Sequence, residues 1–285
     1  MLGALLAVLV AILTVEGLSL DMIPVVPPFP LSRASFIASF GTSVLLSSST
    51  PLSVLQTVGD PDTYEALLYK PPLAKSLKLL PLLVVLPGAG KNQRGAMADM
   101  ASPKGEQAGL ACALLNSGKA PNSLSDNFVV IQPYPMGKTS FYEEPRARLL
   151  SFVDWFLANN KNLVDPEQIH LYGFSDGATV AVEIATTGRF QSVVIAACGL
   201  SGTLPPRALE LLKAPFWVFH SVDDEVFPVA CSDRLVDSLR KSNGGEAVRY
   251  SRLEKGAGGH RGAGIAASSD PEVYKWMLSQ RRRPS

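Results

Sequence analysis

Residues 169–178 read IHLYGFSDGA, an apolar run that ends in a serine flanked by glycines and continues into helix-favouring residues. Gly173, Ser175 and Gly177 match G-x-S-x-G, a sharp strand-to-helix turn that lifts the serine above the edge of a sheet. Crowded backbone leaves no room for side chains on either side of that serine, which explains the glycines. Ser175 is therefore the candidate nucleophile. The alternative interpretation is a structural serine in a glycine-rich turn.

Other apolar runs without polar alternation lie on both sides of this segment. They are PLLVVLP (81–87), FVVIQP (128–133), SVVIAACG (192–199) and PFWVFH (215–220). Such runs are typical of strands buried on both faces. Helical patterns over 145–160, 178–186 and 206–213 separate them, which predicts parallel βαβ units. Reactive residues in such sheets lie where the strands end.

A serine hydroxyl needs a general base, and the base needs an acid that orients it. In proteins with this strand–turn–helix arrangement the acid follows the serine and the base comes last. His170 precedes Ser175, and no aspartate lies between Gly177 and His220, so neither histidine fits. His260, in the glycine-rich stretch GAGGHRGAG (256–264), is the candidate base. We expect a flexible loop there, and an exposed loop histidine is the alternative.

The acid and the donors for a developing oxyanion also follow strand ends. FHSVDDEVFP (219–228) offers two candidate acids, Asp223 and Asp224. An oxyanion needs backbone N–H donors, each worth roughly 3 to 4 kcal/mol. Asp176 supplies one N–H directly after the nucleophile. The turn after LLVVLP supplies the second, with Ala89 and Gly90 as the candidate residues.

Several blocks of the sequence together resemble a known family. They are LPLLVVLPGAGKNQRG, VDPEQIHLYGFSDGA, PFWVFHSVDDEVFPV, GAGGH and VYKWMLSQRR, spread over about residues 62–282. They look like the α/β-hydrolase family that includes predicted peptidase-like esterases, feruloyl esterases and polyhydroxybutyrate depolymerase-like proteins. The resemblance implies an α/β-hydrolase fold, with a mostly parallel central sheet and helices on both faces. It also implies a Ser-Asp-His triad.

The resemblance distinguishes the two candidate acids. In that family the acid stands four residues after the histidine of an H-G-x-x-D-x-x-x-P block, and His220 and Pro228 fix that position as Asp224. Asp223 is the fallback. Pro87 stands where the family usually has a histidine before the oxyanion turn, and Ser221 and Ala178 replace glycines. Proline fixes φ and lacks an N–H, but the family's donors lie further along the turn, so activity is still expected.

The overall composition excludes several classes of function. With 26 basic and 25 acidic residues, the chain has no excess charge with which to bind a nucleic acid. Cys112, Cys198 and Cys231 show no paired spacing, so a disulfide framework is not predicted. No histidine has a second histidine or a cysteine three or four residues away, so we expect no metal site and no cofactor.

The chain is expected to hold one catalytic domain over residues 61–285. Before it, residues 1–20 begin with an apolar stretch uncharged up to Glu16, which favours a signal peptide or a membrane anchor. An apolar helix packed on the domain is the alternative. Residues 21–60, rich in proline and serine, are predicted to be a linker with at most one short strand. The leader implies a secreted or membrane-anchored protein.

The function expected from these residues is hydrolysis of a small-molecule ester through an acyl-enzyme. A serine peptidase would use the same groups. A non-catalytic protein of the same fold that binds a ligand is the third possibility, but a binding protein has no physical reason to carry nucleophile, acid and base together. The sequence contains no long aromatic-rich lid between Gly199 and Pro215, which favours a soluble ester of modest size.

Overall fold

A single mixed sheet organises the described part of the chain, with strands in the order β1-β2-β4-β3-β5-β6-β7-β8. The computed structural model describes residues 54–60, 62–72, 78–89, 96–104, 107, 109–134, 146–200, 204–242 and 247–280. All of them lie within one compact unit, Pro51–Ser285. The predicted targeting segment, residues 1–20, lies outside the described residues.

Five of the eight described strands fall where the apolar runs predicted them. The bounds of all eight are β1 Leu55–Gly59, β2 Glu65–Tyr69, β3 Leu80–Leu86, β4 Val129–Pro133, β5 Val164–Phe174, β6 Ser192–Ala196, β7 Phe216–Ser221 and β8 Val248–Leu253. Neighbouring strands from β4 through β3 to β8 pair in parallel, whereas β1 and β2 are antiparallel. The prediction of a mostly parallel sheet is confirmed.

Strand β1 lies inside the segment 21–60 that the sequence assigns to a linker. It pairs with β2 from Leu55 opposite Tyr69 to Gly59 opposite Glu65. An edge strand that shares a hydrogen-bonded ladder with its neighbour belongs to the same folding unit. The sheet therefore begins before residue 61, and the predicted short strand in this segment is part of it.

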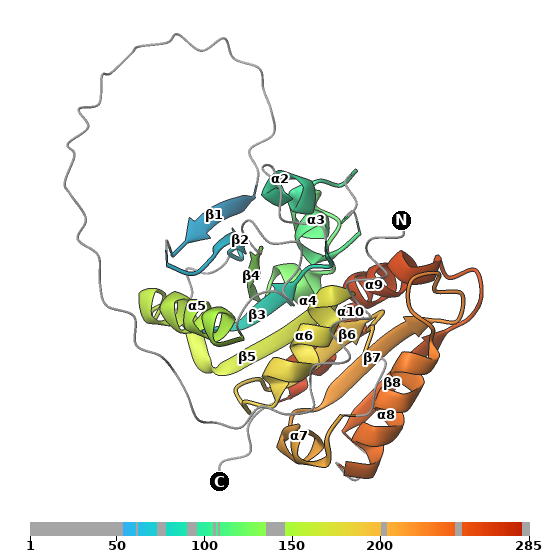
Figure 1. Cartoon of the computed structure of the whole chain (residues 1–285). Helices are drawn as coiled ribbons and strands as arrows, with labels where there is room; N and C mark the ends of the chain where they lie inside the picture. Colours follow the sequence, from blue (N-terminus) through green and yellow to red (C-terminus); the bar gives the residue numbers. More distant parts are fainter. Residues whose placement is uncertain are drawn as a thin grey trace, which may run out of the picture. The chain divides into compact units, whose positions relative to one another are not determined.

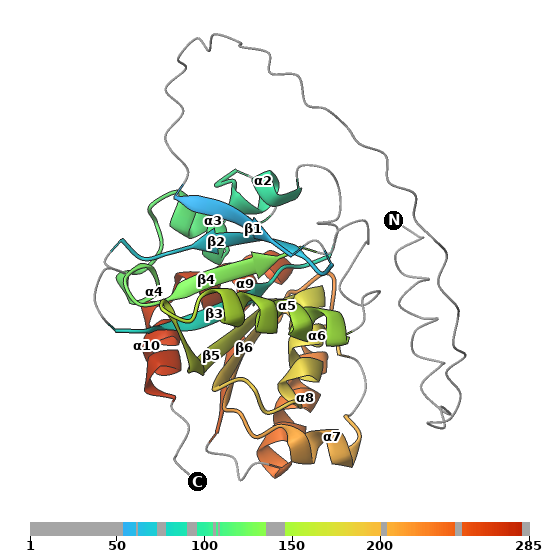
Figure 2. The same cartoon turned by 90° about the vertical axis from the view of Figure 1, so that its left-hand side faces the viewer.

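Helices cover both faces of the sheet, as Figure 1 and Figure 2 show. The helices on one face are α5 Arg146–Asn159, α6 Asp176–Ala185, α7 Pro206–Leu211 and α8 Ala230–Ser242. Those on the other are α2 Ala96–Ala101, α3 Ala111–Asn116, α4 Asn122–Ser125, α9 Gly259–Ser269 and α10 Pro271–Ser279. Among the described residues, no helix combines the length and apolar character needed to cross a bilayer.

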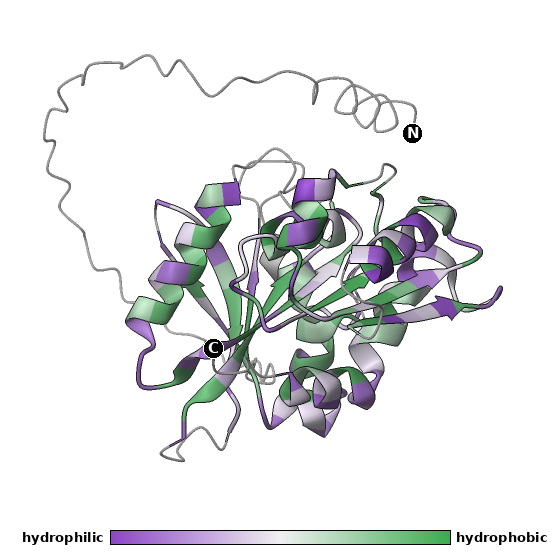
Figure 3. Ribbon diagram, turned by 90° about the horizontal axis from the view of Figure 1, so that it is seen from below, coloured by the Kyte–Doolittle hydropathy of each residue, from purple (hydrophilic) through white to green (hydrophobic). Residues whose placement is uncertain are grey.

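The two hydrophobic layers arise from the two-residue period of the strands. In β3, Leu82, Val84 and Leu86 pack on the α5 side, and Leu83 and Val85 pack on the α9 side. All five are buried, as expected for a central strand with helices on both faces. Figure 3 shows mostly hydrophobic colouring along the central strands and a mixture of hydrophobic and hydrophilic colouring on the helices.

The chain changes direction across the sheet at β3. From β3 it moves to β4 on one side, and after α5 it returns to β5 on the other side. The carboxyl ends of β3 and β5 are thus adjacent, with Leu86 opposite Gly173. Such a reversal leaves a crevice outside the strand ends, which is where open α/β sheets bind their ligands.

Candidate active site

Ser175 occupies a strained turn between β5 and α6. Its φ of 56° and ψ of −115° are uncommon for a residue with a side chain. A Cβ on Gly173 would lie 2.4 Å from the carbonyl oxygen of Gly177, and a Cβ on Gly177 would lie 2.3 Å from that of Leu86. Backbone therefore fills the space on both sides of the serine, which is why glycines are needed at both positions.

Backbone hydrogen bonds hold this turn against the next strand. The N–H of Ser175 donates to the carbonyl of Ala196 at 2.9 Å, and the carbonyl of Ser175 accepts from Ala178 at 3.0 Å. Ser175 is only 9% exposed. The strained conformation is thus fixed by its surroundings, and the hydroxyl has little freedom to move away from its partner.

Three of the predicted residues lie in one hydrogen-bonded chain. Nε2 of His260 lies 2.8 Å from Oγ of Ser175. On the other side of the ring, Nδ1 of His260 lies 2.8 Å from Oδ2 and 3.0 Å from Oδ1 of Asp224. The three side chains come from the turn after β5, the start of α9 and the segment after β7. The fold therefore brings together residues that are far apart in the sequence.

His260 lies in the first turn of helix α9, whereas the sequence predicted a flexible loop. Three glycines come just before it: Gly256, Gly258 and Gly259 have φ values of 92°, 97° and 60°. These left-handed conformations turn the chain back over the sheet edge before the helix starts. A helical backbone restricts the direction of the imidazole more than a loop would.

The carboxylate of Asp224 is completely buried and has several donors. Its Oδ1 accepts from the N–H groups of Val226 and Phe227, both at 2.8 Å. Burial by itself would raise the pKa of Asp224, but hydrogen bonds from His220, His260 and the Phe227 N–H outweigh it and hold the pKa below its usual range. Asp224 therefore stays ionised.

Asp223, the fallback acid, faces elsewhere. It accepts a hydrogen bond from the Ser221 hydroxyl and another from the N–H of Gly256 at 2.7 Å. These two hydrogen bonds lower its pKa, with the Ser221 contribution the larger. Of the two candidate acids, Asp224 is the one whose carboxylate contacts the ring of His260.

His220 has an acid partner that the sequence argument overlooked. No aspartate precedes it after Gly177, but Asp224 follows it by four residues, and Nε2 of His220 lies 3.0 Å from Oδ2 of Asp224. Nδ1 of His220 lies 2.7 Å from the hydroxyl of Ser232. With both ring nitrogens engaged and the side chain fully buried, His220 supports the acid and is not placed to serve as the base.

Two aromatic rings border the imidazole of His260. The ring centroid of Phe174 lies 5.2 Å away, and that of Phe227 lies 5.5 Å away in an edge-on arrangement. The His260 side chain is 12% exposed. Sequence reasoning missed these rings, although both lie within the blocks that carry the catalytic candidates.

Two of the predicted oxyanion donors, Asp176 and Ala89, lie at the same strand ends. Asp176 is the first residue of α6, where helix N–H groups point outward. The turn after β3 runs alongside Ser175, because a Cβ on Gly88 would lie 3.3 Å from Cβ of Ser175. Ala89 is exposed at this edge, and Gly90 lies outside the described residues.

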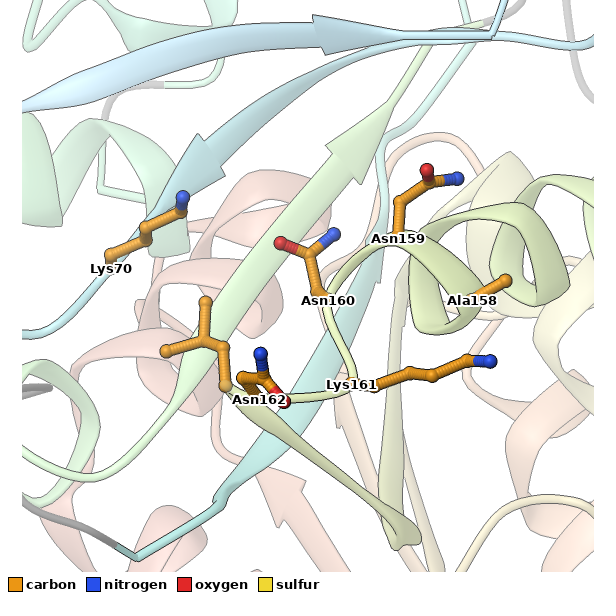
Figure 4. A pocket seen from close by; sticks show the side chains of 7 residues that line it. Lys70, Ala158, Asn159, Asn160, Lys161 and Asn162 are labelled. Atoms are coloured by element: carbon orange, nitrogen blue, oxygen red, sulfur yellow. The ribbon is translucent and has the colours of Figure 1, made fainter.

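A hollow on the opposite edge of the sheet is separate from this site. It is lined by Lys70 after β2 and by residues 158–163, from the last residues of α5 to the residue before β5, as Figure 4 shows. These residues lie at the amino end of β5, whereas Ser175 follows its carboxyl end. Within the described ranges, no group of three or more histidine, cysteine or acidic side chains is arranged to hold a metal ion.

Comparison with known proteins agrees with this architecture. Residues 148–258 match the model of the phospholipase/carboxylesterase family, a range that contains Ser175 and Asp224 and ends just before His260. A thermostable esterase of known structure superposes with a TM-score of 0.62 over 81% of this chain, at 24% identity. The chain has the α/β-hydrolase fold. It spans 63% of the length of that esterase.

Other solved structures share this α/β-hydrolase fold. An acetyl ester-xyloside bifunctional hydrolase from Caldicellulosiruptor lactoaceticus has a TM-score of 0.52 at 19% identity, covering 77% of this chain and 89% of its own. The acylaminoacyl peptidase of Pyrococcus horikoshii has a TM-score of 0.57 at 14% identity, covering 82% of this chain and 43% of its own. No curated protein matches the chain by sequence.

Proposed function

We propose that this protein is a serine hydrolase that cleaves a carboxylic ester through an acyl-enzyme. The observation that carries the proposal is the continuous chain of contacts from Ser175 through His260 to the buried carboxylate of Asp224. This is the arrangement a weak alcohol nucleophile needs, because a positioned base must take its proton and a carboxylate must orient that base.

In the acylation step, Oγ of Ser175 attacks the carbonyl carbon of the ester while Nε2 of His260 takes the hydroxyl proton. Asp224 holds the other ring nitrogen and stabilises the imidazolium that forms. The carbonyl oxygen becomes an oxyanion that faces the N–H of Asp176 and the turn after β3. Collapse of the intermediate breaks the ester C–O bond, and His260 returns the proton to the departing alcohol.

Deacylation uses the same groups in the reverse roles. A water molecule attacks the acyl carbon, and its proton passes to Nε2 of His260. The second intermediate then releases the carboxylic acid, and Oγ of Ser175 regains its proton from the imidazole. No step requires a cofactor, because the nucleophile, the base and the oxyanion donors all come from the chain.

A small-molecule ester is the substrate class we propose. The description of the matched family, phospholipase/carboxylesterase, and the esterase among the structural neighbours support it. A serine peptidase is the second candidate, because a neighbour of the same fold is an acylaminoacyl peptidase. An amide would require His260 to protonate a poorer leaving group, so the two candidates differ in one chemical step.

The first test uses a fluorophosphonate probe, which modifies only an activated serine. We expect the wild-type protein to be labelled at Ser175 and the Ser175→Ala variant not to be labelled. Ser269→Ala is the matched control, because Ser269 is an exposed serine on α9, the helix that carries His260. Failure of the wild-type protein to react would favour the non-catalytic, ligand-binding alternative.

The second test separates esterase from peptidase. We expect the wild-type protein to turn over short p-nitrophenyl esters and to show little or no turnover of the matching p-nitroanilides. The Ser175→Ala variant should turn over neither. Comparable rates on esters and anilides would assign the protein to the peptidases. Undiminished ester turnover in Ser175→Ala would place the chemistry elsewhere in the molecule.

A further inference from the structure

Three consecutive acidic residues after β7 all contact the segment that carries His260. Oδ2 of Asp223 accepts from the N–H of Gly256 at 2.7 Å. The carboxylate of Asp224 contacts the imidazole of His260. Oε2 of Glu225 accepts from the backbone N–H of His260 at 3.1 Å. Residues 223–225 thus contact the histidine segment at three points: the N–H of Gly256, the imidazole of His260 and the backbone N–H of His260.

The segment 256–259 has little of its own to hold it in place. Gly256, Gly258 and Gly259 have positive φ values and no side chains to pack. Glycine loses more conformational freedom on ordering than any other residue, so a fixed conformation here needs contacts from outside the segment. The two flanking carboxylates, on Asp223 and Glu225, supply such contacts.

Glu225 also supplies a hydrogen-bond acceptor for a backbone N–H at the start of α9. The N-cap residue just before this helix, Gly258, has no side chain with which to cap it. A helix leaves its first N–H groups without partners inside the helix, and an anion near that end is favourable. Glu225 takes the N–H of His260 and so caps α9 from a distant part of the chain.

The glycine at position 259 is what lets this carboxylate come close. A Cβ on Gly259 would lie only 2.3 Å from Oε2 of Glu225, a distance at which the two atoms would overlap. The close approach of backbone and carboxylate therefore requires both the glycine at position 259 and the glutamate at position 225. On the other side, Asp223 is itself held by the hydroxyl of Ser221 at the end of β7.

We propose that Asp223 and Glu225 are positioning residues that fix the start of α9, so that the His260 ring stays between Ser175 and Asp224. This inference rests on the proposed function, in which His260 is the general base. Neither carboxylate touches the reacting atoms; both act through the backbone of the histidine segment. A displacement of about 1 Å at a catalytic group can lower a rate by roughly 100-fold, so such restraints matter for turnover.

The test measures ester turnover and fluorophosphonate reactivity in Asp223→Ala, Glu225→Ala and the double variant. We expect kcat and the labelling rate to fall about 10-fold in each single variant and more in the double one, with KM nearly unchanged. Asp223→Asn and Glu225→Gln keep an oxygen acceptor and should retain most of the wild-type rate. Glu254→Ala is the matched control, because Glu254 is an exposed acid just before the glycine segment.

A second measurement reads the histidine directly. The chain has only three histidines, so their ring signals can be followed by NMR of histidine-labelled protein. We expect the His260 signal to shift or broaden in Glu225→Ala while the signal of the buried His170 stays unchanged. Circular dichroism checks that each variant is folded.

The outcomes separate this inference from the proposed function. A wild-type protein that does not react with the probe would remove the proposed function itself. A reactive wild-type protein, together with alanine variants that react equally fast and keep the wild-type His260 signal, would overturn the positioning role alone. Conservative variants as slow as the alanine variants would also overturn it, because they retain the hydrogen-bond acceptors.

Discussion

Nε2 of His220 lies 3.0 Å from Oδ2 of Asp224, so one buried carboxylate is shared between two imidazoles. The same nitrogen also lies 3.1 Å from the carbonyl oxygen of Phe227. Both neighbours are acceptors, so Nε2 must carry a proton. The hydroxyl of Ser232 completes the arrangement at Nδ1. Asp224 thereby keeps a donor on each side, which orients it toward His260.

Replacing His220 tests whether this second imidazole matters for catalysis. We expect His220→Phe to lower the fluorophosphonate labelling rate and kcat by about 10- to 100-fold, since a hydrogen bond to a charged group contributes roughly 1.5 to 3 kcal/mol. Ser232→Ala should have a smaller effect, because Ser232 contacts the ring and not the carboxylate. Wild-type rates in a folded His220→Phe protein would contradict this role.

The glycines of the turn around Ser175 should tolerate no side chain. Gly177→Ala would place a Cβ 2.3 Å from the carbonyl oxygen of Leu86, so backbone must move. We expect a loss of more than about 3 kcal/mol in the free energy of unfolding, measured in urea. Gly118→Ala is the control. Its φ is 68° but nothing lies within 4 Å, so only about 1 to 2 kcal/mol of conformational strain is expected.

His170 should make the protein less stable in mild acid. Burial lowers its pKa to about 4, from an ordinary value near 6.5. Between these values the unfolded chain binds a proton that the folded protein does not. The free energy of unfolding therefore has its full value above about pH 6.5 and decreases as the pH falls, by about 2 kcal/mol at pH 5.

Urea unfolding at pH 7.5 and pH 5 measures this loss. The difference in the free energy of unfolding between the two pH values should be smaller by about 2 kcal/mol in His170→Asn, whose amide can still reach Ser192 but does not titrate. An equal pH dependence in wild type and variant would mean that other groups cause the acid sensitivity.

The N-terminal segment provides a prediction outside the described residues. Removing residues 1–25 should leave a folded and active protein, because residues 1–15 are uncharged and apolar and are followed by the proline-rich PVVPPFP. We propose that this segment directs the chain to a secretory or membrane route. Cell fractionation and N-terminal sequencing of the full-length protein test the route. Loss of activity in a soluble truncated form would mean that the segment packs against the catalytic unit.

Much of the framework could be predicted from local patterns. The buried strands, the intervening helices and the turn around Ser175 each depend on residues close together in the sequence. Glycines at 173 and 177 are required by steric contacts whose cause lies within the same turn and the adjacent β3. The choice of Asp224 over Asp223, by contrast, came from resemblance to a family, since both follow the same strand.

The helical position of His260 and the role of His220 could not be read from the sequence. A glycine-rich stretch is compatible with a loop or with the start of a helix, and the choice depends on the contacts that Glu225 and Asp223 make with it. Likewise, the partner of His220 depends on how the chain turns after β7.

The succession of strands and helices along the chain, the glycine-flanked turn at Ser175 and the candidate residues could all be predicted from the sequence. They follow from side-chain periodicity and from the steric limits of the neighbouring backbone. The distances among Ser175, His260 and Asp224 and the sharing of Asp224 with His220 are properties of the tertiary structure. His260 lies 85 residues after Ser175 and 36 after Asp224 in the sequence, and His220 and Asp224, four residues apart, meet through the turn after β7; these are all side-chain contacts. They form when parallel strands place their carboxyl ends at one edge of a sheet, which no single segment specifies alone.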